Sequence, residues 1–216
     1  QERPESGFRT AALPTQHIHF TDNVIDAVGS ADIIMIAVGT PPKQNGEADT
    51  RYVEEAAYEV TQGLRPHRAY TLVVKSTVPI GTNRRVAQIV GRALSERGVE
   101  TDVYFASNPE FLQEGLALRG TFYPDRIVVG AEQPEAVDAL RRLYRPILEQ
   151  TFDPPGFLPR PDGYNLPPLI TTDPTSAEMI KYAANTFLAL KISFINEMAG
   201  LCEKVGADVT EEARGI

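Results

Sequence analysis

Short apolar runs alternate with longer amphipathic stretches through most of this chain, and this alternation constrains the fold more than any other feature. The runs are rich in Val and Ile, which is typical of strands. Strands that alternate with helices indicate a parallel sheet with crossover helices, and continuous apolar strands indicate a sheet covered on both faces. The expected strands are 18–20, 33–38, 70–74, 103–106 and 127–129, and the expected helices are 23–30, 51–64, 82–97 and 134–144.

The last third of the chain follows a different pattern. Residues 151–172 are rich in proline, and we expect most of this stretch to be a linker without regular structure. Beyond it, Asp173 or Thr175 can cap a helix that continues to about residue 205 and ends before Gly206. Such a helix is about 45 Å long, and it is apolar on several faces, so it needs more than one neighbour.

Composition narrows the class of protein. The 216 residues, 42% of them hydrophobic, are enough for one sizeable core and one to two domains. A net charge of −8 disfavours a nucleic-acid partner, because phosphate binding relies on clustered Lys and Arg. The apolar runs are too short to span a membrane, and a single cysteine, Cys202, fits a reducing compartment, so we expect a cytoplasmic protein. The three histidines are scattered, and we expect no metal site.

Four segments carry a specific resemblance. They are VGTPPK at 38–43, VKSTVPIGT at 74–82, NPEFLQEG at 108–115 and EMIKYAANTFLALKISFINE at 178–197. Together they resemble the nucleotide-sugar 6-dehydrogenases, and KISFINE and PDRIVVG look closer to the branch that acts on UDP-glucose.

The resemblance implies a fold and a domain plan. The fold is α/β, with a partial doubly wound, Rossmann-like parallel sheet followed by a long central helix that packs in a homodimer. Residues 1–16 are an unassigned lead, 17–150 a partial NAD-binding domain, 151–172 the linker, and 173–216 the central helix and the start of the dimerisation domain.

The resemblance also implies a reaction. The family passes two hydrides from C6 of a UDP-sugar to two NAD molecules, through a thiohemiacetal and a thioester on a cysteine, so UDP-glucose would become UDP-glucuronate. UDP-N-acetylmannosamine and GDP-mannose stay open as alternative substrates. A piece that serves only dimerisation or interaction is the alternative outside enzymes.

Two carboxylates lie in NPEFLQEG. Glu110 and Glu114 are four residues apart, and an isolated pair of this kind is more often merely solvated. By resemblance, Glu110 positions the water that hydrolyses the thioester, and Glu114 lies by the nicotinamide. Phe111 and Leu112 would line the sugar-nucleotide pocket. Strand ends of this kind are where ligands bind in open α/β sheets.

Lys181 and Asn185 are one turn apart on the long helix. A solvated face is the ordinary reading, but Lys181 lies in an apolar stretch, where a buried ammonium needs a partner. By resemblance, both residues hold the oxyanion and bind sugar hydroxyls. Lys191 is interpreted as a residue at the edge of the core whose charge reaches solvent.

Further polar residues follow two strands. Ser76 and Thr77 could simply cap the next helix. By resemblance, Thr77 binds the catalytic water or the cofactor, and Ser76 lines the same site. Residues Val38, Gly39, Thr40 and Pro41 would approach the dinucleotide, and the glycine permits that approach.

Two features of the family are not found in these 216 residues, namely the Gly-rich dinucleotide fingerprint and the Gly-flanked nucleophilic cysteine. Cys202 lies 21 residues beyond Lys181 on one helix, about 31 Å away, so it is interpreted as a small buried residue. We therefore expect a central portion of an enzyme that is inactive alone. We also expect the strand at 33–38 to present an open edge.

Overall fold

The computed structural model describes residues 18–113 and 115–216, so the segment 1–16, predicted to be an unassigned lead, lies outside the described residues. A five-stranded sheet forms the centre, with the strands in the order β1-β2-β3-β4-β5. Its strands are β1 (Ile33–Ile36), β2 (Ala69–Val74), β3 (Asp102–Ser107), β4 (Ile127–Ala131) and β5 (Leu169–Thr172). The α/β class is confirmed.

The sheet is not wholly parallel, which corrects the expectation. β1–β2, β2–β3 and β4–β5 pair in parallel, whereas β4 runs antiparallel to β3. The connection from β3 to β4 contains only the short helix α4 (Ala117–Phe122), which buries no residue and so does not serve as a crossover helix packed on the sheet.

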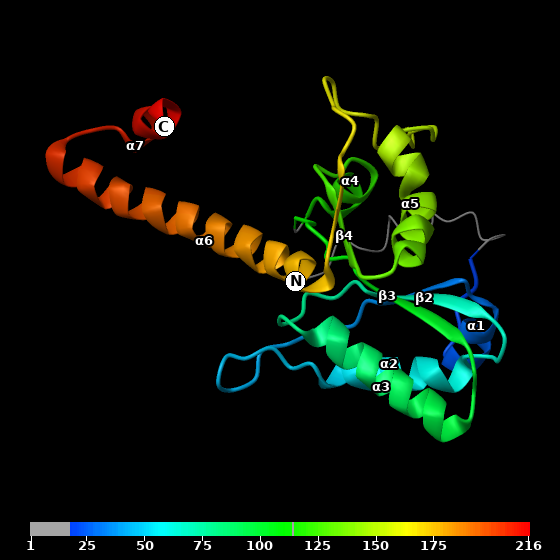
Figure 1. Ribbon diagram of the computed structural model, residues 1–216. Coiled ribbons are helices and arrows are strands. Elements are labelled where there is room, and N and C mark those ends of the chain that lie inside the picture. The colour runs from blue at the N-terminus through cyan, green and yellow to red at the C-terminus, as the bar shows by residue number, and fades with distance from the viewer. Residues whose placement is uncertain (1–17, 114) are drawn as a thin grey trace.

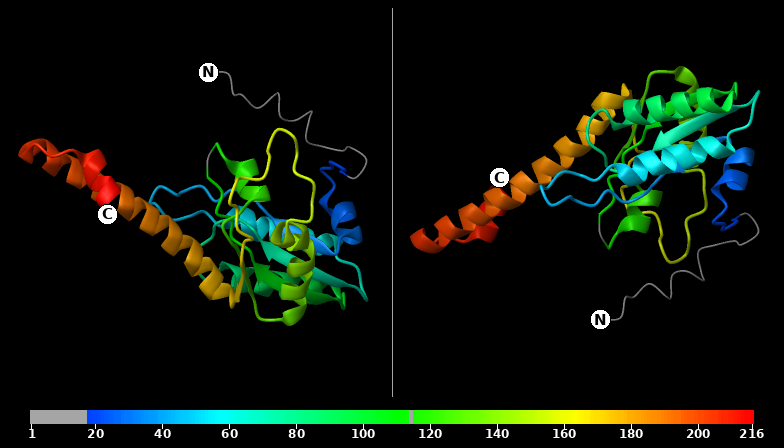
Figure 2. Two further views of the ribbon diagram at one scale, coloured as in Figure 1. Left: turned by 90° about the horizontal axis from the view of Figure 1, so that it is seen from above. Right: turned by 90° about the horizontal axis from the view of Figure 1, so that it is seen from below.

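Helices cover both faces of the sheet, as Figures 1 and 2 show. Leu72 and Val74 of β2 pack in one core with α2 (Arg51–Gly63) and α3 (Thr82–Arg97), and α1 (Val24–Ser30) joins this core through Val28. Val73 faces the opposite side, in a core with α5 (Pro134–Glu149).

Two segments, one expected strand and part of the expected linker, differ from the prediction. Residues 18–20 form no strand, and Phe20 is 78% exposed, because so short a run needs a neighbouring strand and β1 pairs only with β2 among the described residues. At the end of the linker, residues 169–172 are not irregular but form β5, because they pair with β4. Residues 151–168 hold no regular element.

The long helix α6 (Pro174–Val205) extends away from the sheet (Figure 1). Asp173 caps its first turn by accepting a hydrogen bond from the Ser176 N–H at 2.9 Å, and Gly206 ends it in the left-handed conformation at φ 75°. The short helix α7 (Val209–Gly215) follows and contacts α6. In the part of the chain that the structure describes, no helix is long and apolar enough to cross a membrane.

Candidate functional site

The carboxyl ends of β1 and β2 are tied together by two side-chain hydrogen bonds. The Ser76 hydroxyl donates to the Val38 carbonyl oxygen at 2.6 Å, and the Thr40 hydroxyl donates to the Thr77 carbonyl oxygen at 2.7 Å. The segments 38–41 and 76–77, which resemblance assigns to one site, therefore lie side by side.

This strand end leaves room for a ligand close to the backbone. A Cβ built on Gly39 would meet no atom within 4 Å, and a hollow of about 380 Å³ lies against Val38, Gly39, Pro41 and Tyr52 of α2. An open glycine at the carboxyl end of a parallel strand fits the approach of a dinucleotide to the main chain.

The end of β3 brings Glu110 to Lys181 of α6. The Lys181 ammonium lies 3.3 Å from a carboxylate oxygen of Glu110, and the Lys181 side chain is only 8% exposed. The other Glu110 oxygen accepts the Leu112 N–H at 2.6 Å, which fixes the carboxylate. Because Lys181 is nearly buried, this pair is screened much less than a surface ion pair.

Phe111 lies close to two cations. Lys181 Nζ lies 5.2 Å from the centre of its ring, and the guanidinium of Arg126 lies 4.1 Å from the same ring. Both distances are within the range of cation–π attraction, so the ring helps to hold Lys181 beside Glu110.

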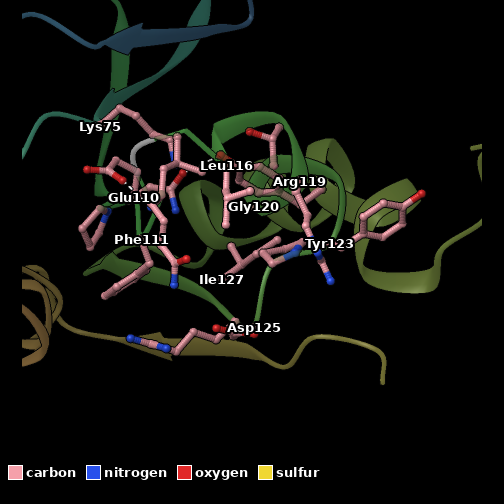
Figure 3. Close-up of a pocket in the computed structure, with 17 residues that line it drawn as sticks. Lys75, Glu110, Phe111, Leu116, Arg119, Gly120, Tyr123, Asp125 and Ile127 are labelled. Carbon is pink, nitrogen blue, oxygen red and sulfur yellow. Dashed lines mark hydrogen bonds between the residues drawn. The ribbon is translucent and has the colours of Figure 1, made fainter. Parts of the chain in front are cut away.

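Lys75 belongs to the same region, although the sequence reasoning did not select it. It lines a pocket of about 380 Å³ together with Glu110 and Phe111 (Figure 3). Burial lowers the pKa of Lys75, while the nearby Glu110 carboxylate opposes that shift. The signal in the sequence is a lysine placed directly after the apolar strand 70–74.

A buried polar chain supports this pocket. The Tyr144 hydroxyl donates to the Asn108 side-chain oxygen at 2.6 Å, and the Asn108 amide donates to the Val128 carbonyl oxygen at 2.7 Å. The Lys75 ammonium lies 5.9 Å from the centre of the Tyr144 ring, and burial raises the pKa of Tyr144 to about 12. The Tyr144 hydroxyl therefore stays protonated as a donor at neutral pH.

The remaining candidates are placed as follows. Leu112 lines the same pocket as Phe111. Asn185 is exposed one turn beyond Lys181, and Lys191 is exposed with its ammonium 5.8 Å from the Phe187 ring. Glu114 lies outside the described residues.

Cys202 is buried at the far end of α6, where its thiol donates to Glu212 at 2.9 Å. Across residues 18–113 and 115–216, no group of three His, Cys, Asp or Glu side chains could hold a metal ion.

Two family models match the chain. The NAD binding domain of the UDP-glucose/GDP-mannose dehydrogenase family matches residues 4–148, and the central domain of the same family matches residues 175–216.

Curated relatives and solved structures agree with these matches. A UDP-glucose 6-dehydrogenase of Rhizobium meliloti is 43% identical over 203 residues, which are 92% of this chain and 41% of the relative. A UDP-glucose dehydrogenase structure from Pyrobaculum islandicum is 42% identical with a TM-score of 0.74, and the match covers 91% of this chain and 41% of that one. A GDP-mannose dehydrogenase structure from Pseudomonas aeruginosa has the same TM-score at 31% identity, with 90% and 41% covered. The chain thus spans about 41% of the length of these relatives.

Proposed function

Because the chain belongs to the UDP-glucose/GDP-mannose dehydrogenase family, we propose that it forms part of an enzyme that oxidises C6 of UDP-glucose to the carboxylate of UDP-glucuronate. The observation that carries this proposal is the ion pair of the nearly buried Lys181 with the partly exposed Glu110 at the carboxyl ends of the strands. That edge is where open α/β sheets bind their ligands.

Lys181 is proposed to stabilise the negative charge that develops on the sugar oxygen during oxidation. A cation that is already held in place and shielded from water does this at little cost of reorganisation. Asn185, one turn further along α6, is proposed to bind the oxyanion and the sugar hydroxyls from the exposed side of the helix.

Glu110 is proposed to orient the water that hydrolyses the thioester and to accept its proton. Its carboxylate is fixed by the Leu112 N–H, which leaves its direction well defined. Thr77 is proposed to bind the same water or the cofactor, and Glu114 to lie near the nicotinamide. Phe111 and Leu112 are proposed to contact the sugar nucleotide.

NAD is the cofactor that the family implies, and it supplies the acceptor for the hydride. The residues proposed to hold it are Val38, Gly39, Thr40 and Pro41 with Ser76 and Thr77. Their two hydrogen bonds join the two strand ends, and the open space at Gly39 leaves room for a ligand.

Among the candidate sugar nucleotides, UDP-glucose is favoured by the sequence identity of this chain to the solved dehydrogenases. The UDP-glucose and GDP-mannose dehydrogenase structures have the same TM-score, but the first is 42% identical and the second 31%.

We also propose that α6 packs in a homodimer. Its outer turns expose large apolar side chains that water would otherwise contact, and such a surface is typical of an interface. They are Phe187, Leu188, Leu190, Ile192, Phe194, Leu201 and Val205.

The test uses a full-length dehydrogenase, the Rhizobium meliloti relative, whose matching segment is replaced by this chain; we call it the chimera. We expect the chimera to form NADH, followed at 340 nm, with UDP-glucose and far less with GDP-mannose or UDP-N-acetylmannosamine. A folded chimera that prefers one of the other two sugars would overturn the choice of substrate. One that binds NAD but oxidises none of the three would overturn the proposed reaction.

A further inference from the structure

Glu178 is a nearly buried carboxylate that the proposed reaction does not use. It lies in the first turns of α6, one turn before Lys181, and is 3% exposed. A carboxylate taken out of water needs strong hydrogen bonds to offset its desolvation. The hydrogen-bond partners of Glu178 therefore indicate its structural role.

Both oxygens of Glu178 accept backbone N–H groups at the start of α3. Gly81 donates to one oxygen at 2.5 Å, and Asn83 donates to the other at 2.8 Å. The N-cap residue of α3 is Gly81, and no side chain of its own caps this helix. Glu178 therefore accepts backbone N–H groups that have no partner within α3. Negative charge is also favourable at a helix N-terminus.

The two ends of this contact carry different parts of the proposed site. Gly81 closes the segment that begins with Ser76 and Thr77, and Glu178 is three residues from Lys181, on the same face of α6. We infer that Glu178 is a positioning residue that holds Lys181 against Glu110 by fixing α6 on the start of α3. This inference rests on the proposed role of Lys181.

A close approach on β4 fixes the same turn of α6. A Cβ built on Gly130 would lie 2.5 Å from the Ala177 Cβ and 2.6 Å from the Asp173 carbonyl oxygen. Only a glycine permits this approach. Gly130 therefore sets how near α6 comes to the sheet, while Glu178 sets where it is held along α3.

The test measures the reactivity of individual lysines in the 216-residue chain, by brief acetylation and mass spectrometry of peptides. Glu178→Gln keeps the size of the side chain but replaces one carboxylate oxygen by an NH2 group. This group cannot accept a hydrogen bond from the backbone N–H that faces it. We expect the acetylation rate of Lys181 to rise about fivefold or more, because loss of a buried hydrogen bond shifts local opening by that order. Lys75, directly after β2, and Lys191, already exposed, should keep their rates.

The matched control is Glu197→Gln, the same substitution at an exposed position of the same helix, which should change none of the three rates. An unchanged Lys181 rate in Glu178→Gln would overturn the inference. If Lys75 and Lys181 both become reactive, the variant has lost its fold and Glu178 is a general stabiliser, which also overturns it. Hydrogen exchange at Gly81 and Asn83 gives a second measurement, and it should accelerate only in Glu178→Gln.

The labelling needs neither sugar nor NAD. Its result therefore stands whether or not the chimera oxidises UDP-glucose, and the two proposals can fail separately.

Discussion

The sheet and the outer turns of α6 use apolar residues in opposite ways. In β2, Leu72 is 1% exposed and packs between helices, whereas on α6 Leu188 is 59% exposed and Phe187 is 62% exposed. Between these two regions lies the seat of α6, its first turns up to Lys181, where the buried side chains include Glu178 and Lys181.

The contrast indicates different roles for three regions of the chain: the sheet, the seat and the outer turns of α6. Apolar burial in the sheet supplies stability. Polar burial in the seat costs stability unless each group is paired, and we propose positioning and catalytic roles for these residues. Apolar exposure on the outer turns forms the surface that we propose packs in the homodimer.

The largest effect is expected in the sheet. Leu72→Ala should lower the free energy of unfolding by about 2–5 kcal/mol, because it leaves a cavity in a closed core. Leu188→Ala should change it by about 0.5 kcal/mol or less at a protein concentration where sedimentation shows a monomer. Urea unfolding of the 216-residue chain measures both. Equal losses would mean that the outer turns of α6 already pack within one chain.

The next prediction compares one lysine of the seat with one lysine of the outer turns by their effects on kcat. In the chimera, Lys181→Ala should lower kcat about 100-fold to 1000-fold, since it removes a fixed cation from the reacting oxygen. Lys191→Ala, the same change on the exposed part of the helix, should leave kcat within a factor of a few. Similar losses from both would refute the assignment of Lys181.

Glu110 is expected to act later than Lys181. In the chimera, Glu110→Gln should keep the first NADH burst relatively fast while a covalent sugar-nucleotide adduct accumulates, because an amide cannot accept the proton of the hydrolytic water. Intact mass after a single turnover detects the adduct. Loss of the burst together with absence of the adduct would mean that Glu110 serves the first step, through its ion pair with Lys181.

Local signals predicted α1, α2, α3, α5 and α6, but neither of the short helices α4 and α7. The bounds of α3 agree with the predicted 82–97, and α6 begins after Asp173 and ends at Gly206, because caps and apolar spacing are written in neighbouring residues. α5 was predicted to end at residue 144 but continues to Glu149 through Pro146, which removes one backbone hydrogen-bond donor from the helix without ending it.

Non-local features were harder to predict. β5 follows a Pro-rich stretch and becomes a strand only through its pairing with β4, and the reversed direction of β4 depends on how the chain returns after β3. In the site, the resemblance selected Glu110 and Lys181, but their contact joins residues 71 positions apart and required the fold. Lys75 was missed because a lysine at a strand end is usually solvated, and its burial depends on α5.

The smallest expected effect concerns the N-cap residue of α6, at the start of the seat. Asp173 accepts hydrogen bonds from the Ser176 N–H at 2.9 Å and from the Ser176 hydroxyl at 2.5 Å, and these bonds lower the pKa of Asp173 below its ordinary value of 3.8. A carboxylate with a lowered pKa in the folded state stabilises the fold above its ordinary pKa, and this contribution is lost as the pH falls through the folded value.

Asp173→Ala should therefore lower Tm by a few degrees at most at pH 7, and the difference from the unsubstituted chain should shrink below about pH 4. Thermal unfolding followed by circular dichroism measures it, with Asp153→Ala, an exposed aspartate of the linker, as the control that should change little at either pH. A difference that persists undiminished at pH 3 would mean that the Asp173 carboxylate does not act through its charge. Asp173 would then hold the start of α6 through uncharged hydrogen bonds to Ser176.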